Sequence, residues 1–310
     1  MKNDICIAAP WVLALGLLAG PAHATLFVSG QVHASGLGLA QFDDTSQTTA
    51  VSGSADKWMS GSGGNASAYA NWGVLKVAGQ SLDTVVDNAP SLSIATAIWT
   101  DKVTFSSTQT FAANASAILH ASMLISGDFS HARGSSSADS AQDPWAITSG
   151  DLSFSASGCY SNGGGFRVGQ TDILNHTGLH RSARFISNNV PRELGSMFGI
   201  FEFDISMPIG CARDFGARLQ GTSDNSARGG GFASSSFALD HSAYWGGISS
   251  VTVDGVAVSD FSLLGASGHD WAKSSIPTGP GDNHVPEPAT AWLSLLGLVG
   301  LGYGLRKAQG

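Results

Sequence analysis

The sequence predicts an all-β protein, and its composition and one alternating stretch carry that prediction. The acidic residues are twenty Asp against three Glu, and only six Lys occur in 310 residues. Glu and Lys favour helix surfaces, whereas Asp favours turns and caps. Forty Gly among many Ser and Thr indicate short strands joined by turns. We therefore expect an antiparallel β-sandwich, of jelly-roll or Ig-like type, over residues 25–275.

The alternating stretch runs from Phe111 to Ile125. Its apolar residues fall on odd positions, which places them on one face of an extended strand. They are Phe111, Ala113, Ala115, Ala117, Leu119, Ala121, Met123 and Ile125. An Ala-rich segment can also form a helix, but the period of two favours a strand. We expect this strand to be among the longest in the protein, with its odd residues buried.

The other elements follow from the same reasoning, because alternating or apolar runs predict strands and polar, Gly-rich runs predict loops. The predicted strands cover residues 26–34, 69–78, 91–106, 151–160, 197–206, 247–253 and 256–264. The predicted loops cover residues 42–67, with one short strand around Trp58, and residues 127–150. The last two strands flank Asp254-Gly255, a dipeptide typical of a type I′ hairpin turn.

The C-terminal end has the composition of a single membrane anchor. Pro286 and Pro288 prevent a helix from starting before Ala289. Seventeen residues without a formal charge follow, up to Leu305, which is near the lower limit of about 17–25 residues that cross a bilayer. Arg306-Lys307 comes next, and a basic flank indicates the cytoplasmic side. We expect one C-terminal transmembrane helix whose tail lies in the cytoplasm.

The same residues resemble a known sorting signal. Val285-Pro286-Glu287-Pro288, the Leu/Gly-rich run and the basic pair Arg306-Lys307 are similar to the PEP-CTERM signal of Gram-negative bacteria. The resemblance implies that a membrane-embedded exosortase reads the Pro-Glu-Pro element and processes a transient anchor. It also implies an exported protein at the cell surface or in an exopolysaccharide matrix, and it implies nothing about the role of the domain that precedes the tail.

Residues 1–24 have the features of a secretory signal peptide. Lys2 precedes a short apolar segment, and Ala22-His23-Ala24 fits an A-x-A cleavage site. We therefore expect the Sec translocon and signal peptidase as partners, and a mature chain that begins near Thr25. The remaining boundaries are a Pro- and Gly-rich linker at residues 276–284 and the sorting tail at residues 285–310.

The net charge argues against one class of partner. The whole chain has 15 basic and 23 acidic residues. Without Lys2, Asp4, Arg306 and Lys307, 12 basic and 22 acidic residues remain, or a net charge near −10. Nucleic acid and anionic membrane surfaces are therefore not expected as partners. Neutral polysaccharide, or acidic polysaccharide bridged by cations, is compatible with this charge.

Cys159 and Cys211 form the one pair of cysteines outside the signal peptide, which contains Cys6. An even pair in an exported chain favours a disulfide, because the compartment is oxidising. Such a bridge would close a loop of about fifty residues and stabilise the fold by roughly 4 kcal/mol. Two buried free thiols are the alternative.

No catalytic residue, metal site or cofactor is predicted. His176 and His180 would share a face only on a helix, and Gly178 between them argues against one. The acidic loops lack the spacing of a calcium-binding loop, and turn formation explains them. They contain Asp43, Asp44, Asp83, Asp87, Asp139 and Asp143. The domain contains only Glu193 and Glu202 as glutamates, which argues against a glycosidase with paired Glu.

Six arginines between Arg181 and Arg228 have two interpretations: they face a sugar acid, or they pair with nearby carboxylates, which we favour. Six Trp of the domain are more often core residues than sugar-binding residues. They are Trp58, Trp72, Trp99, Trp145, Trp245 and Trp271.

Together these features predict a non-enzymatic structural or interaction protein of the cell surface or the exopolysaccharide matrix. A carbohydrate-binding or adhesion module is the first alternative, and a concave face lined by Trp and Tyr would favour it. A secreted hydrolase that uses Asp residues is the second, and a cleft with two facing carboxylates would favour it.

Overall fold

The computed structural model describes residues 24–34, 38–59, 62–84, 90–112, 114–134, 144–159, 163–175, 177–187, 190–227 and 231–278. The chain divides into two compact units, Met1–Ser274 and Ser275–Gly310. Only residues 275–278 of the second unit are described, and they belong to no strand, so the described sheets lie in the first unit. The predicted signal peptide up to His23 and the predicted C-terminal helix lie outside the described residues, and the predicted domain boundaries stay predictions.

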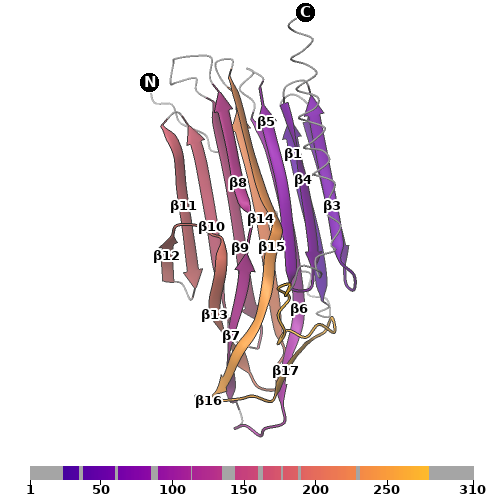
Figure 1. Ribbon diagram of the computed structural model, residues 1–310. Coiled ribbons are helices and arrows are strands. Elements are labelled where there is room, and N and C mark those ends of the chain that lie inside the picture. The colour runs from indigo at the N-terminus through magenta and orange to yellow at the C-terminus, as the bar shows by residue number, and fades with distance from the viewer. Residues whose placement is uncertain are drawn as a thin grey trace, which may run out of the picture. The chain divides into compact units, whose positions relative to one another are not determined.

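The described part of the chain forms two antiparallel sheets (Figure 1). Its seventeen strands are β1 Thr25–Ala34, β2 Gly38–Ser46, β3 Val51–Met59, β4 Ser62–Asn71, β5 Val74–Asp83, β6 Ser91–Ser107, β7 Ser116–Ile125, β8 Asp128–Gly134, β9 Trp145–Ser157, β10 Gly164–Asn175, β11 Gly178–Ser187, β12 Val190–Leu194, β13 Gly199–Pro208, β14 Arg213–Ser226, β15 Phe232–Val253, β16 Val256–Ala257 and β17 Phe261–Gly265.

Sheet A has nine strands in the order β12-β11-β10-β9-β14-β6-β1-β2, with β17 also paired to β6. Sheet B has eight strands in the order β13-β7-β15-β5-β4-β3, with β8 and β16 also paired to β15. The residues that the structure describes contain no helix, and accordingly none of them belongs to an apolar helix long enough to cross a membrane.

The two sheets pack face to face because each buries every second residue along its strands. β5 and β7, for example, alternate strictly between half-buried and buried residues, and β1 and β14 of sheet A lie against β4 and β5 of sheet B. The prediction of an all-β, antiparallel fold is confirmed. The jelly-roll or Ig-like subtype stays a prediction.

One half of the core is aromatic. Phe154 on β9 contacts Trp99 and Phe215 of its own sheet, at centroid distances of 6.1 and 5.6 Å. It also contacts Phe203 and Trp245 of sheet B, at 5.0 and 5.6 Å. These tilted and edge-on arrangements are the favoured geometries of aromatic pairs. Because the rings come from both sheets, their packing holds one sheet against the other.

The last described segment of the first unit closes over this cluster, and we call residues 261–274 the C-terminal clasp. Its strand β17 pairs with β6, and the fully buried indole of Trp271 packs 4.3 Å from that of Trp99. The Trp271 indole N–H donates to the buried Asp101 carboxylate at 2.7 Å, and Ser267 Oγ donates to the same oxygen at 2.6 Å. Trp245 Nε1 in turn donates to the Trp271 carbonyl at 2.8 Å. The clasp therefore fastens the chain to both sheets.

Another part of the core contains a cluster of small polar side chains among its apolar residues. Ser81 and Ser235 of sheet B both lie within hydrogen-bonding distance of Ser223 Oγ in sheet A, at 2.6 and 2.7 Å. The Asn225 amide donates to the Ser81 carbonyl at 2.7 Å. Direct bonds between these short side chains require the sheets to approach closely here. In this part of the core, hydrogen bonds between side chains therefore join the two sheets.

The predicted long strand at residues 111–125 is shorter than expected. Strand β7 begins at Ser116, and its odd residues from Ala117 to Ile125 are buried as predicted. Before it, Asn114 adopts φ 68° and the Ala115 N–H donates to the Ala112 carbonyl at 3.1 Å, which makes a turn. The prediction that this strand is among the longest is therefore wrong: β15 has 22 residues and β6 has 17, against 10 in β7.

The predicted loop at residues 42–67 is also wrong, because it contains most of β2, β3 and β4. Its Ser, Gly and Asn residues indicate a loop in isolation, yet ladder pairing and the burial of small residues such as Ala55 and Ala66 stabilise strands. The predicted strand 69–78 crosses the Trp72-Gly73 turn between β4 and β5. The predicted loop 127–150 contains β8 and the start of β9.

The Asp254-Gly255 hairpin is confirmed. The two residues have φ of 50° and 80°, as a type I′ turn requires, and join β15 to β16. The strand predicted at residues 256–264 is interrupted at Val258, after which β17 joins sheet A instead of sheet B.

We expect Trp271→Ala to lower the free energy of unfolding by about 3–5 kcal/mol, because it opens a cavity beside Trp99 and removes a donor from buried Asp101. Trp58→Ala is the matched control: its side chain is 47% exposed, and its loss should cost less than about 1 kcal/mol. Urea denaturation of both variants measures the two losses of unfolding free energy. Equal losses would show that buried Trp271 stabilises the fold no more than exposed Trp58.

Candidate functional site

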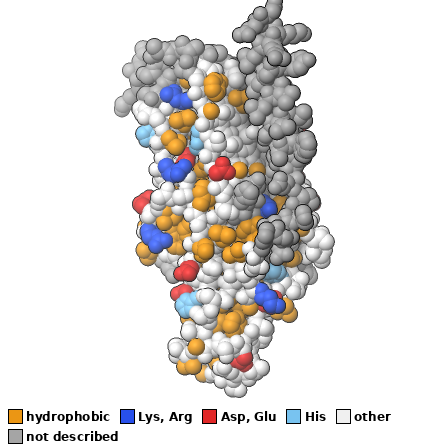
Figure 2. Space-filling view, in the orientation of Figure 1, with side chains coloured by type: hydrophobic (Ala, Val, Ile, Leu, Met, Phe, Trp, Pro, Cys, Tyr) orange, Lys and Arg blue, Asp and Glu red, His pale blue; other side chains and the backbone are white. Residues whose placement is uncertain are grey.

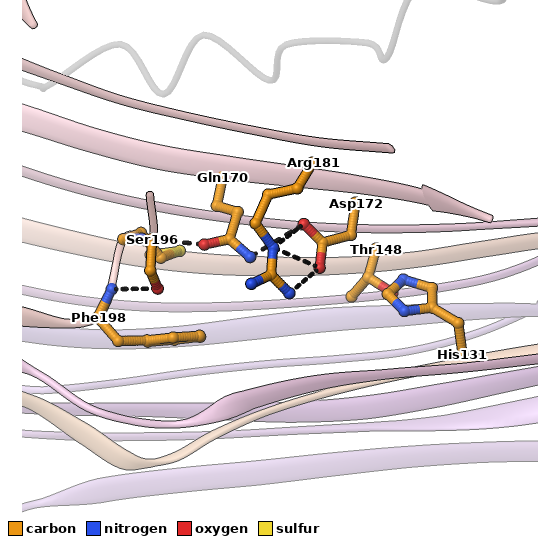
Figure 3. Close-up of polar contacts among 8 residues, drawn as sticks. His131, Thr148, Gln170, Asp172, Arg181, Ser196 and Phe198 are labelled. Carbon is orange, nitrogen blue, oxygen red and sulfur yellow. Dashed lines mark hydrogen bonds and ion pairs between the residues drawn. The ribbon is translucent and has the colours of Figure 1, made fainter. Parts of the chain in front are cut away.

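A buried ion pair stands out among the polar groups of the structure (Figure 3). Asp172 on β10 has no exposed side-chain surface, and Arg181 on β11 is 44% exposed. Arg181 Nε donates to Oδ1 and Oδ2 of Asp172 at 2.9 and 3.1 Å, and Arg181 Nη2 donates to Oδ2 at 2.7 Å. This bond to the carboxylate raises the pKa of Arg181 above its ordinary value. The pair is therefore a fixed charge-assisted contact.

The β10–β11 hairpin places the two side chains opposite each other. The register pairs Asp172 with Arg181 and Asn175 with Gly178 at the turn. Gly178 has φ 115°, and the Thr177 N–H donates to Asn175 Oδ1 at 2.9 Å, as in an Asx-type turn. This pair was not predicted from the sequence. Interpreting the Asn-His-Thr-Gly stretch as a hairpin turn would have found it, because Asp172 and Arg181 are equidistant from the turn.

Gln170 supports the carboxylate from the same strand. Its Nε2 donates to Asp172 Oδ1 at 3.0 Å, and its Oε1 accepts the Met197 N–H at 2.9 Å (Figure 3). The amide orientation is thus set by both bonds. Gln170 links the ion pair to the segment between β12 and β13.

His131 of β8 lies on the sheet B side of this group. Its Nε2 is 2.6 Å from Thr148 Oγ1 on β9 (Figure 3). Burial lowers the pKa of His131, and the nearby Asp172 carboxylate opposes that effect only partly. The neutral imidazole is therefore favoured in the folded protein at neutral pH.

Strands β10 to β12, residues 164–194, form the end of sheet A, and we call them the arginine wing. Arg184 pairs loosely with Glu193, 4.0 Å away. Arg192 lies over the Phe185 ring, 5.4 Å from its centroid, and in the part of the chain that the structure describes it has no carboxylate within ion-pair distance. The wing thus contains both paired and unpaired guanidinium groups.

The six arginines singled out in the sequence therefore divide. Arg181 and Arg184 pair with carboxylates, as the favoured interpretation predicts, and Arg192 does not. Arg213 is fully buried and donates to the Gly158 carbonyl at 2.8 Å. Arg218 donates to Gln220 at 2.6 Å. Arg228 lies outside the described residues.

An open hollow of about 760 Å³ lies beside the Gly163–Gly165 stretch. Phe154, Phe166, Arg167 and Asp204 are among its lining residues, and Asp204 is its one carboxylate. Asp204 Oδ1 is 2.6 Å from His120 Nδ1, so this carboxylate is already paired.

Cys159 and Cys211, the pair expected from the sequence, are joined by a disulfide with a Cα–Cα distance of 6.1 Å. The bridge ties the end of β9 to the segment before β14, 52 residues later. It lies at the end of two paired strands and restrains their loops.

Two aspartates of the acidic loops have local hydrogen-bonding roles in the described structure. Asp44 accepts the Thr45 N–H and buried Asp83 accepts the Ala227 N–H, at 2.7 and 2.8 Å, so turn and end-capping roles explain them. Within the described ranges no three His, Cys, Asp or Glu residues gather to hold a metal ion. His180 lies 2.5 Å from Thr177 Oγ1. His176, Asp87, Asp139 and Asp143 lie outside the described residues.

Asp224 on β14 is the one carboxylate of the described residues with a resolved upward pKa shift. Burial raises its pKa to about 6, and its buried Oδ1 has no hydrogen-bond partner. Ionised Asp224 therefore destabilises the folded state.

We expect Arg181→Gln to lower the free energy of unfolding by about 3 kcal/mol, because it leaves the Asp172 carboxylate buried without its counter-charge. Adding Asp172→Asn removes that charge and should restore most of the stability. Arg184→Gln, which breaks an exposed pair, is the control and should cost less than about 0.5 kcal/mol. Denaturant titrations give the values, and a double variant no more stable than Arg181→Gln would contradict the interpretation.

We expect Asp224→Asn to stabilise the protein by roughly 2 kcal/mol at pH 8 and by very little at pH 3.5. The folded-state pKa, about 6, exceeds the ordinary value of 3.8. Ionisation therefore costs stability as the pH rises through this window, and the cost vanishes where both states are protonated. Exposed Asp214→Asn on the same strand is the control, and unfolding midpoints at the two pH values test both. A pH-independent gain would refute the titration of Asp224.

The residues predicted for sorting lie outside the described part of the chain, except for Ala24, which is buried, and Thr25, which begins β1. They are Ala22, Val285, Pro286, Glu287, Pro288, Arg306 and Lys307. The sequence itself, however, matches a known family motif there.

Comparison with known proteins finds the PEP-CTERM protein-sorting motif at residues 284–308. No curated protein and no solved structure matches the chain. The motif indicates export, delivery to the cell surface or the extracellular space, and processing by exosortase, a membrane protease. The chain is therefore a PEP-CTERM domain-containing protein, with its sorting motif in the last residues and a two-sheet β domain before it.

Proposed function

We propose that the β domain has a non-enzymatic structural or interaction role at the cell surface or in an exopolysaccharide matrix. The sorting motif at residues 284–308 is the observation that carries this proposal, because it sends the domain out of the cell. In the proposed route, Sec and signal peptidase act at Ala22-His23-Ala24. The uncharged run from Ala289 to Leu305 then serves as a transient transmembrane anchor until exosortase processes the tail.

The use of the aromatic residues supports a structural role. Trp99, Trp245 and Trp271 are completely buried and hold the sheets together. Trp58 is the one Trp among the largely exposed apolar residues of the described chain. A stacking platform for neutral sugars needs several exposed rings, so the distribution of Trp favours a scaffold over a lectin of that kind.

The carboxylates support a non-enzymatic role. The hollow beside Gly163–Gly165 presents one carboxylate, Asp204, already paired with His120. The Asp172 carboxylate is neutralised by Arg181. Acid–base hydrolysis of a glycosidic bond needs two carboxyl groups that face each other across a cleft, and neither place supplies such a pair.

A carbohydrate-binding or adhesion module is the second candidate. The exposed guanidinium groups of the arginine wing favour it, because planar guanidinium groups bind carboxylates with two parallel hydrogen bonds.

Replacing Pro286-Glu287-Pro288 with three Ala residues should leave export intact but trap the unprocessed chain in the inner membrane. The linker change Thr278-Gly279-Pro280 to three Ala is the matched control and should be processed normally. Cell fractionation and the mass of the recovered protein, with and without the exosortase, measure both outcomes. Normal surface delivery of the first variant would show that the motif is dispensable and would remove the basis of the proposal.

A further inference from the structure

We propose that the inner face of the arginine wing binds a polysaccharide that carries carboxylate groups, with Arg181 and Arg192 as the contact residues. The inner face consists of Leu179, Arg181, Ala183 and Phe185 on β11 and Val190, Arg192 and Leu194 on β12. This inference rests on the proposed interaction role and names its ligand class.

The arginine wing contains more basic than acidic residues, unlike the chain as a whole. The formal net charge of the chain is −8, yet residues 164–194 contain four arginines against the two acids Asp172 and Glu193. Arg167, Arg181 and Arg184 pair with Asp151, Asp172 and Glu193, so Arg192 carries the positive charge that is left over in the described wing. The overall charge argued against anionic partners, but recognition depends on the local field. The unpaired charge of Arg192 attracts the carboxylates of a polymer to this place, whereas the net negative charge of the rest of the chain repels them.

The position of the wing leaves Arg181, Arg192 and the neighbouring Leu179 and Val190 accessible, whereas Ala183 and Phe185 of the same face are buried, Phe185 against Phe201 of β13. β12 is the last strand of sheet A, and β13 is the last strand of sheet B. In Figure 1, β11 and β12 stand beyond β13 at the margin of the molecule. Figure 2 shows basic, acidic and hydrophobic side chains intermixed along that margin. Leu179 is 52% exposed and Val190 is 67% exposed, which provides apolar contacts for sugar rings beside the charges.

The buried Asp172 carboxylate fixes the orientation of the Arg181 guanidinium group. Asp172 uses the Nε–H and one Nη2–H of the guanidinium group. A guanidinium group has five N–H donors, so three remain for a ligand, and Figure 3 shows one terminal nitrogen without a contact. Because the side chain is fixed by Asp172, binding costs less side-chain entropy.

Arg192 supplies the second contact. Its guanidinium group lies over the Phe185 ring, and in the described structure it has no carboxylate partner. Stacking on an aromatic face orients the group while it leaves its N–H donors in the plane free. A ligand carboxylate would therefore satisfy a charge that the described protein leaves unpaired.

The spacing favours a polysaccharide over denser polyanions. Arg192 is paired with Phe185, four residues along β11 from Arg181, which separates the two arginines by about 14 Å. Duplex DNA carries one charge per ~1.7 Å of its axis, and the net negative charge of the rest of the chain opposes such dense polyanions. Two guanidinium groups at this separation suit carboxylates spread along a sugar chain.

The test measures binding of the full-length chain, in a non-ionic detergent, to polygalacturonate. The control ligand is its methyl ester, which keeps the backbone and removes the charge. Two variants address the contacts: Arg192→Gln, and the double variant Asp172→Asn/Arg181→Gln, which leaves no buried charge unpaired. Arg218→Gln, which removes an exposed arginine outside the wing, is the matched control.

We expect saturable binding to polygalacturonate that weakens with salt and is absent for the methyl ester. Arg192→Gln and the double variant should each lower the affinity about tenfold, and Arg218→Gln should change it less than about twofold. The proposal is overturned by no binding, by equal losses in all three variants, or by equal affinity for duplex DNA or for vesicles of an anionic phospholipid.

Failure of this inference is separable from failure of the proposed function. If the protein reaches the surface through its sorting motif but does not bind polygalacturonate, the ligand class is wrong and the interaction role is untouched. If surface delivery does not need the motif, the proposed function fails whatever the binding result.

Discussion

The structure depends on one contact between the sheets: the packing of Phe154, Trp245 and Trp271. The two sheets share no ladder in this region, so side-chain packing must hold them together. Trp271 contributes hydrogen bonds to both sheets in addition to the packing of its ring. Its indole N–H donates to Asp101 in sheet A, and its carbonyl accepts the Trp245 indole N–H from sheet B. Large rings fill this part of the core, whereas direct Ser and Asn bonds join the sheets in another part, where the sheets approach closely.

The two sheets do not match in extent, and this mismatch creates the surface of interest. Sheet A continues through β11 and β12 at its end, where sheet B ends in β13. Phe185 of β11 still packs on Phe201 of β13, but the exposed residues of β11 and β12 must carry side chains that tolerate water. The β10–β12 segment meets that need with arginines, one fixed on buried Asp172 and one on the Phe185 ring. The same exposed guanidinium groups that tolerate water can also bind anionic ligands.

The sorting motif and the β domain occupy separate stretches of the sequence. The motif lies at residues 284–308, whereas the C-terminal clasp ends the first compact unit at Ser274. Because Trp271 is buried in the aromatic core, the chain is fastened to the domain only a short distance before the motif.

The sequence alone determined the features that depend on local patterns: the sorting motif, the all-β class, the Asp254-Gly255 turn and the buried odd face of β7. These rest on backbone geometry or on linear motifs, which neighbours do not alter. Tertiary structure decided the strand assignment at residues 42–67, because small polar residues form strands only when a partner strand and an opposing sheet are present. It also decided the Asp172–Arg181 pair, the Trp271 clasp and the exposed Arg192. Each of these depends on which strands are adjacent and in which register they pair. The amino-acid composition does not contain that information.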